Sequence, residues 1–287
     1  MRLQLLHRTT FIYEVTARDS FNEARLQPMD GDGQRLLSFR LRTAPEAPLQ
    51  TFQDYFGNAA HRFTIAAPHA ELVVEAASEV ETDPGLGRAP VPEVPLRSPE
   101  ADAAAAEQVE FLQPSRYVPL DDDLARAAAL VLPGDASAWG AAQEICSFVY
   151  RTLLYRPQST GIETIASEAL KMRAGVCQDF AHVALGLCRC AGLPARYVSG
   201  YFLDTGRRPG EPEASHAWAE AWVPGAGWTA FDPTHNCRTD ERYIRLAVGR
   251  DYADIRPISG TYRGAPTREM RVEVEVRRAS EVRADRG

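Results

Sequence analysis

The sequence predicts an α+β fold, in which an N-terminal antiparallel β-sandwich precedes a core of helices packed on an antiparallel sheet. Apolar and β-branched residues follow strand patterns up to about residue 82. Apolar residues then recur at helical spacing over residues 137–153 and again over 177–191. A strict two-residue alternation over residues 215–223 returns to the strand period.

Composition and charge exclude several classes of protein. The chain has 287 residues, enough for one large domain or two. Its net charge of -7 and the lack of a basic run argue against nucleic-acid binding. No apolar run reaches the length of a membrane span, and the N-terminus lacks a signal-peptide pattern. We therefore expect a cytoplasmic protein that binds neither nucleic acid nor a membrane.

The first 100 residues read as a β-rich unit with a linker. Strands are expected over residues 36–42, 61–65 and 72–80, besides one at the N-terminus. Five prolines between residues 84 and 99 stiffen a connector. We accordingly divide the chain into a β-rich domain with its linker (1–100) and a second domain (101–287) that ends in a C-terminal strand, near residues 270–276. The sequence does not say which sheet that strand joins.

The stretch around Cys177 carries the strongest chemical signal. A glycine-bearing turn leads into Cys177, which opens an apolar helix that ends at a glycine–proline signal, Gly192 to Pro194. Unpaired N–H groups and the helix dipole favour a thiolate at such a position, and they can stabilise an oxyanion. The other cysteines (146, 188, 190 and 237) show neither a disulfide framework nor zinc-site spacing. We therefore expect no metal and no cofactor.

A nucleophilic cysteine needs a base, and the base needs an orienting partner. His216 begins one strand of a predicted hairpin and Asp232 ends the next. An even-numbered loop would turn Asp232 away from His216, so we predict an odd loop or a bulge. Two other histidines compete for the role of base: His182 points elsewhere on the Cys177 helix, and His235, just beyond the hairpin, is the second choice.

Four core segments and several N-terminal ones resemble a known family. The core segments are Gly-Val-Cys-Gln-Asp-Phe-Ala-His (175–182), Gly-Leu-Pro-Ala-Arg-Tyr-Val-Ser-Gly-Tyr (192–201), Ser-His-Ala-Trp-Ala-Glu-Ala-Trp (215–222) and Gly-Trp-Thr-Ala-Phe-Asp-Pro-Thr (227–234). They resemble the transglutaminase-like superfamily, in particular its bacterial cysteine-protease-like members. His7-Arg8-Thr9-Thr10, Asn22-Glu23-Ala24-Arg25-Leu26-Gln27-Pro28 and Tyr55-Phe56-Gly57-Asn58 are similar to the N-terminal region that accompanies these members. The resemblance implies a papain-like, transglutaminase-like catalytic core with a Cys177–His216–Asp232 triad.

Three functions are compatible with that triad. The leading one is thiol-dependent hydrolysis of a peptide or isopeptide amide through a thioester. In acyl transfer, as in a transglutaminase, an amine instead of water resolves the thioester. The third is a non-catalytic binding or assembly module on the same core. The expected partner is a peptide or protein amide substrate, and a further protein partner or a homo-oligomer is left open. Residues 204–214 are the candidate lid, and a side chain from residues 155–161 is the candidate second oxyanion donor.

Overall fold

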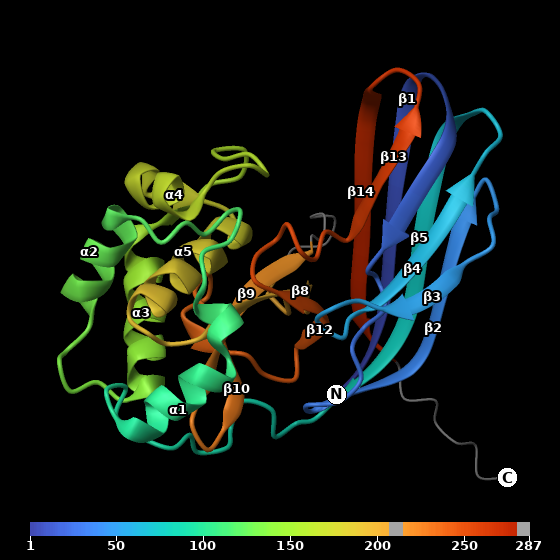
Figure 1. Cartoon of the computed structure of the whole chain (residues 1–287). Coiled ribbons are helices and arrows are strands. Elements are labelled where there is room, and N and C mark those ends of the chain that lie inside the picture. Colours follow the sequence, from blue (N-terminus) through green and yellow to red (C-terminus); the bar gives the residue numbers. More distant parts are fainter. Residues whose placement is uncertain (207–214, 280–287) are drawn as a thin grey trace, which may run out of the picture.

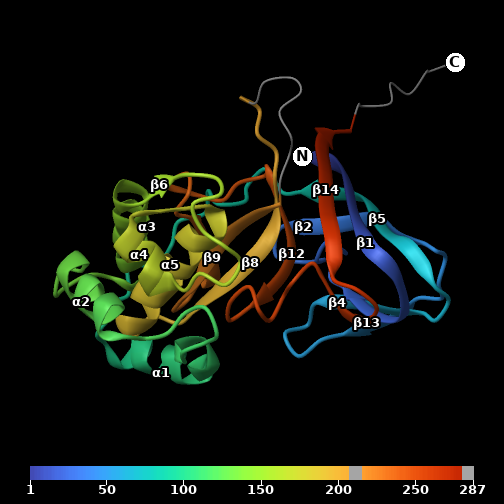
Figure 2. The ribbon, with the colours of Figure 1, turned by 90° about the horizontal axis from the view of Figure 1, so that it is seen from above.

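The computed structural model describes residues 1–206 and 215–279 of the chain. Most of the candidate lid therefore lies outside the described residues. Three layers follow one another across the molecule (Figures 1 and 2): helices, a five-stranded sheet, and a second, taller sheet.

The strands and helices have the following bounds. The strands are β1 (Arg2–Ala24), β2 (Gln34–Ala44), β3 (Gln50–Gln53), β4 (Ala59–Ile65), β5 (His69–Thr82), β6 (Leu154–Tyr155), β7 (Ala174–Gly175), β8 (Ala195–Phe202), β9 (His216–Val223), β10 (Gly227–Asp232), β11 (Cys237–Arg238), β12 (Tyr243–Gly249), β13 (Ile258–Arg263) and β14 (Thr267–Arg278). The helices are α1 (Pro99–Glu107), the short 3₁₀ helix η1 (Val109–Leu112), α2 (Asp122–Val131), α3 (Ala138–Thr152), α4 (Ala166–Met172) and α5 (Cys177–Cys190).

The N-terminal strands form an antiparallel sheet in two arms that share β1. The first half of β1 pairs with β5 and β14, and its second half pairs with β4 and β13. Strands β2 and β3 extend the two arms at their outer edges. Buried side chains of both arms, such as Leu72 on β5 and Phe63 on β4, belong to one hydrophobic cluster. The expected antiparallel β-rich N-terminal part is confirmed.

The C-terminal strands return to this first sheet. The strand expected near residues 270–276 is β14, and it pairs with β1 from Leu3 to Tyr13. Strand β13 pairs with the other half of β1. The sequence does not say which sheet the C-terminal strand joins; in the structure it joins the N-terminal sheet and not the sheet of the core. The division of the chain at residue 100 stays a prediction.

The second sheet has the order β11-β10-β9-β8-β12, and α5 packs across β9 and β8 (Figure 1). Close packing is possible because β9 turns three alanines, Ala217, Ala219 and Ala221, into the core, where each is buried. This arrangement confirms the α+β class and the helix-on-sheet core.

The two sheets are docked by apolar and polar contacts. Leu3 and Leu5 of β1 share one hydrophobic cluster with α5 and the second sheet. The fully buried Asn58 donates to the carbonyl oxygen of Val248 (2.8 Å) and accepts from its N–H (2.8 Å). The turn at residues 55–58 is therefore a docking element, which explains its place among the sequence motifs.

Among the described residues, no helix has both the length and the hydropathy that a membrane crossing requires. The cytoplasmic location stays a prediction.

Candidate active site

The turn before α5 fixes the position of Cys177. The Asp179 carboxylate accepts hydrogen bonds from the Val176 N–H (2.8 Å) and the Thr160 hydroxyl (2.7 Å), which caps the helix. A Cβ added at Gly175 would lie 2.6 Å from the Asp179 side chain, so only glycine permits this approach. The glycine, the cap and the cysteine therefore form one local unit.

Cys177 is the first residue of α5, and its side chain is half-buried. The N–H groups of the first helical turn have no acceptor within the helix, so they can stabilise negative charge beside the sulfur. Tyr155 lies near Cys177. The pKa of its phenol is raised, mainly by burial and to a smaller extent by the charge of Cys177. Thr160 of the same loop is engaged with Asp179, and the second oxyanion donor stays a prediction.

The hairpin of β9 and β10 has the odd loop that the sequence predicts. Val223 pairs with Gly227, which leaves a three-residue loop, and Phe231 pairs with Ala219. Gly225 (φ 77°) and Gly227 (φ 74°) provide the left-handed backbone that the turn requires. The register places Asp232 opposite Trp218 and so on the same face as His216.

His216 and Asp232 meet directly. Nε2 of His216 lies 2.7 Å from Oδ2 of Asp232, which leaves Nδ1 for the Cys177 thiol. Burial opposes protonation of His216, but hydrogen bonds to Asp232 and Cys177, together with their charges, raise its pKa to about 10. The raised pKa favours the imidazolium form of His216, which lies between the ionised Asp232 on one side and Cys177 on the other. This is the electrostatic state that a thiolate–imidazolium pair requires.

Asp232 is fully buried and is held by three further groups. Its Oδ2 accepts from the Tyr243 hydroxyl (2.8 Å) and lies 2.6 Å from Nδ1 of His235, while Oδ1 accepts from the Thr234 N–H (2.8 Å). Burial favours the neutral acid, but the bonds from His216 and His235 outweigh it and hold the pKa of Asp232 well below its usual range. The carboxylate stays ionised inside the protein.

The two competing histidines have different surroundings. His182 is fully buried, accepts the Tyr252 N–H (3.2 Å) and stacks on Tyr117, and burial lowers its pKa to about 3. It packs in the core, as its place on the helix predicts. His235 contacts the same carboxylate oxygen of Asp232 as His216 does, and its side chain is 41% exposed. It is a second partner of the carboxylate, a role that the sequence reading did not foresee.

Tyr243 is the site residue that sequence reasoning missed altogether. Its hydroxyl donates to Asp232, and its ring lies 5.3 Å from the Trp218 ring. Tyr243 opens β12, which is two strands away from β9 in the sheet. No local pattern around Tyr243 distinguishes it from a core tyrosine.

His216, Asp232 and His235 also have the donor types of a metal site. Their ligand atoms lie within 4.8 Å of one another, and they are the group of this kind found among the described residues. The sequence predicts no metal here, and the shared oxygen of Asp232 is already engaged by both imidazoles and by Tyr243.

Comparisons with known proteins show which family the chain is similar to. Residues 125–233 match the transglutaminase-like superfamily, and residues 3–81 match the bacterial transglutaminase-like N-terminal region. An uncharacterised protein of Mycobacterium leprae is 35% identical over 283 residues, which cover 96% of this chain and 99% of the relative. A Pseudomonas aeruginosa protein-glutamine gamma-glutamyltransferase is 31% identical over 121 residues, 39% of this chain and 18% of that protein.

A solved structure extends the likeness over nearly the whole fold. The crystal structure of a "putative cysteine protease" from Cytophaga hutchinsonii superposes with a TM-score of 0.76 at 24% identity, and it covers 96% of this chain and 91% of that one. The two family matches fall on the helix-on-sheet core and on the N-terminal sheet, and the solved structure covers both. The chain belongs to the transglutaminase-like superfamily, with the bacterial N-terminal region of that family.

Proposed function

We propose that the protein is a thiol-dependent amide hydrolase that works through a thioester on Cys177, His216 and Asp232. The observation that carries the proposal is the continuous line of contacts from the thiol of a helix-opening cysteine, through the His216 ring, to a buried and ionised Asp232. Nucleophile, base and orienting carboxylate then stand in the order that such chemistry requires.

The reaction proceeds in two stages. The Cys177 thiolate attacks the amide carbonyl carbon, and the first-turn N–H groups of α5 stabilise the oxyanion. The C–N bond breaks as the His216 imidazolium gives its proton to the leaving amine, which leaves a thioester on Cys177. His216 then takes a proton from water, the resulting hydroxide attacks the thioester, and the acid and the thiol are released. Asp232 holds the tautomer and stabilises the imidazolium throughout.

Acyl transfer is the second candidate, and the transferase name of the Pseudomonas relative favours it. The first stage is identical, but an amine nucleophile takes the place of water in the second. The two activities separate in one experiment: a thioester-forming substrate is offered with and without a primary amine. Hydrolysis predicts free acid in both cases, whereas acyl transfer predicts an amide product and a lower yield of acid when the amine is present.

The proposal is tested by the alkylation of Cys177 with iodoacetamide between pH 5 and 9, followed by mass spectrometry. If His216 is an imidazolium beside Cys177, the thiol should be labelled rapidly at pH 6. We expect labelling of the His216→Ala variant at pH 6 to be at least about tenfold slower, because the positive charge beside the thiol is gone. His182→Ala is the matched control and should leave the rate unchanged. Equal rates in the protein and in the His216→Ala variant would favour the binding-module alternative.

A further inference from the structure

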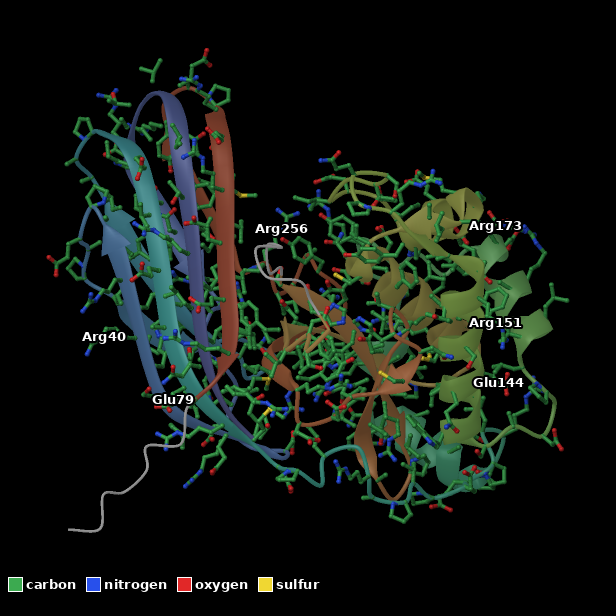
Figure 3. All side chains as sticks on the ribbon, turned by 180° about the vertical axis from the view of Figure 1, so that it is seen from behind. Arg40, Glu79, Glu144, Arg151, Arg173 and Arg256 are labelled. Carbon is green, nitrogen blue, oxygen red and sulfur yellow. The ribbon has the colours of Figure 1, made fainter. Side chains whose placement is uncertain are left out.

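A groove of about 400 Å³ separates the N-terminal sheet from the core beside the candidate active site. Its walls come from β1 and β14 on one side and from the core on the other. Figure 3 shows this junction from behind, with Arg256 labelled between the tall sheet and the core. The inference below rests on the proposed function, since it concerns what that site would bind.

The sheet side of the groove is uncharged. Thr9 pairs with Val272 and Phe11 with Met270, so these side chains share one face of the sheet. Met270 and Val272 are 53% and 43% exposed, large values for apolar side chains. His7 continues the same face, but burial lowers its pKa to about 4, so it is neutral at physiological pH. This wall suits apolar side chains of a ligand.

The core side of the groove leads to the thiol and its base. Ser215, which lines the groove, is the residue immediately before His216. Ile162 lines it as well, and the carbonyl oxygen of Ile162 accepts from the side chain of Gln178, the neighbour of Cys177 (3.1 Å). The core side of the groove therefore borders the segments that carry His216 and Cys177.

Arg256 is the charged residue of this groove. Its Nη2 donates to the Tyr117 hydroxyl (2.7 Å), which fixes the guanidinium against the core. Its Nε is buried and has no hydrogen-bond partner within the described ranges. Among the described residues, no carboxylate lies within 4.0 Å of Arg256, and no aspartate or glutamate lines the groove. A guanidinium that is fixed and lacks a carboxylate partner can donate hydrogen bonds to a bound anion.

We propose that the groove binds the substrate as an extended peptide that brings apolar side chains to β1 and β14 and one carboxylate to Arg256. The apolar wall contributes affinity through burial, and the single cation contributes specificity, because a planar carboxylate can take two parallel N–H donors. The carboxylate is either an acidic side chain or the C-terminus of the peptide, and both present the same group to Arg256.

The test measures binding on the Cys177→Ala variant, so that it does not depend on turnover. Four fluorescein-labelled hexapeptides of leucine, alanine and glycine are compared by anisotropy. Two differ only in a C-terminal carboxylate or carboxamide; the other two, both amidated, differ in an internal glutamate or glutamine. In one of the two pairs, we expect the acidic peptide to bind at least tenfold tighter than its neutral partner. The pair that shows this difference identifies the carboxylate as the C-terminus or as an acidic side chain.

Two substitutions at Arg256 then locate the effect. Arg256→Gln should bring the acidic peptide to within twofold of the neutral one, while Arg256→Lys should retain part of the preference, because the charge stays and the planar fork is lost. Thermal melting checks that each variant is folded. Arg151→Gln is the matched control: Arg151 is exposed on α3, far from the groove in Figure 3, and its loss should change nothing.

The outcomes separate this proposal from the proposed function. If no peptide binds, if acidic and neutral peptides bind alike, or if Arg151→Gln weakens binding as much as Arg256→Gln, the groove is not the peptide site proposed. Cys177 alkylation would still report an active thiol in those cases. If the acidic peptide binds through Arg256 but Cys177 is inert, the groove stands and the hydrolase proposal fails.

Discussion

Cys177 and Cys188 lie on the same helix and meet opposite surroundings. Cys177 is half-buried at the N-terminus of α5, beside an imidazole that is held as a cation. Cys188 is fully buried three turns later, and burial raises the pKa of its thiol to about 12. His216 and His182 repeat the contrast, with pKa values of about 10 and about 3. Residue type alone therefore predicts little: a partner of opposite charge decides whether a buried group is ionised.

The sharpest way to break this comparison is to remove each cysteine in turn. We expect Cys177→Ala to abolish both labelling by iodoacetamide at pH 6 and any amide hydrolysis, a loss of at least about 10³-fold, because the nucleophile is gone. Cys188→Ala should keep both and lower only the melting temperature, because it opens a small cavity in the core. Labelling stoichiometry by mass spectrometry measures the first effect. Persistent labelling of the Cys177→Ala protein at pH 6 would contradict it.

The partners of Asp232 extend the comparison to a smaller effect. Tyr243→Phe removes the hydroxyl that donates to the carboxylate and keeps the packed ring. We expect about a tenfold loss of kcat, the size of one hydrogen bond to a charged group, with little change in KM. His235→Gln should have a similar or smaller effect, since the His235 side chain is 41% exposed. Tyr201→Phe is the control, because it also removes a buried hydroxyl, one that contacts His7 and not Asp232. It should leave kcat and its pH profile unchanged, and an equal loss in both variants would assign the effect of Tyr243→Phe to packing.

Stability should follow pH as the His216 pKa dictates. Its pKa rises from 6.5 to about 10 on folding, so the charged pair stabilises the fold fully below about pH 6.5 and loses this contribution as the pH rises through 10. Asp232, whose pKa falls on folding, contributes above its ordinary pKa and loses its contribution in acid. The protein should melt at a higher temperature than a His216→Gln variant at pH 6, and this difference in melting temperature should shrink towards pH 10. A difference that grows over this range would have the wrong sign.

The smallest expected effect concerns metal. His216, Asp232 and His235 could hold an ion by their spacing, yet the proposed chemistry uses the two imidazoles without one. We expect dialysis against EDTA to leave Cys177 labelling and hydrolysis unchanged within a factor of two. A loss that added zinc restores would instead assign these three side chains to a metal centre.

The sequence predicts those parts of the site that depend on local patterns. The helix start at Cys177 and the alternation of β9 follow from spacing within a few residues. The odd hairpin loop follows from requiring His216 and Asp232 to share one face of the sheet. The role of Tyr243 could not be predicted in this way, because it depends on which strand ends meet, and sheet order decides that. His235 lies only three residues beyond Asp232, but its contact depends on the conformation of the turn after β10, which the spacing alone does not reveal. The wall made by β14 depends on pairing between residues more than 250 positions apart, for which no local signal exists. The functional assignment of Cys177, His216 and Asp232 itself stays a prediction until it is measured.

The pairing of β1 with β14 also sets a time at which the groove can exist. During synthesis β1 leaves the ribosome before β5, and the two can pair once β5 has emerged. Its other neighbour, β14, follows the whole core in the chain, so the wall carrying Val272 and Met270 is added only after the core has been made. Cys177 and His216 are made before that wall. A nascent chain therefore holds the reactive groups before it holds the surface that would select their substrate.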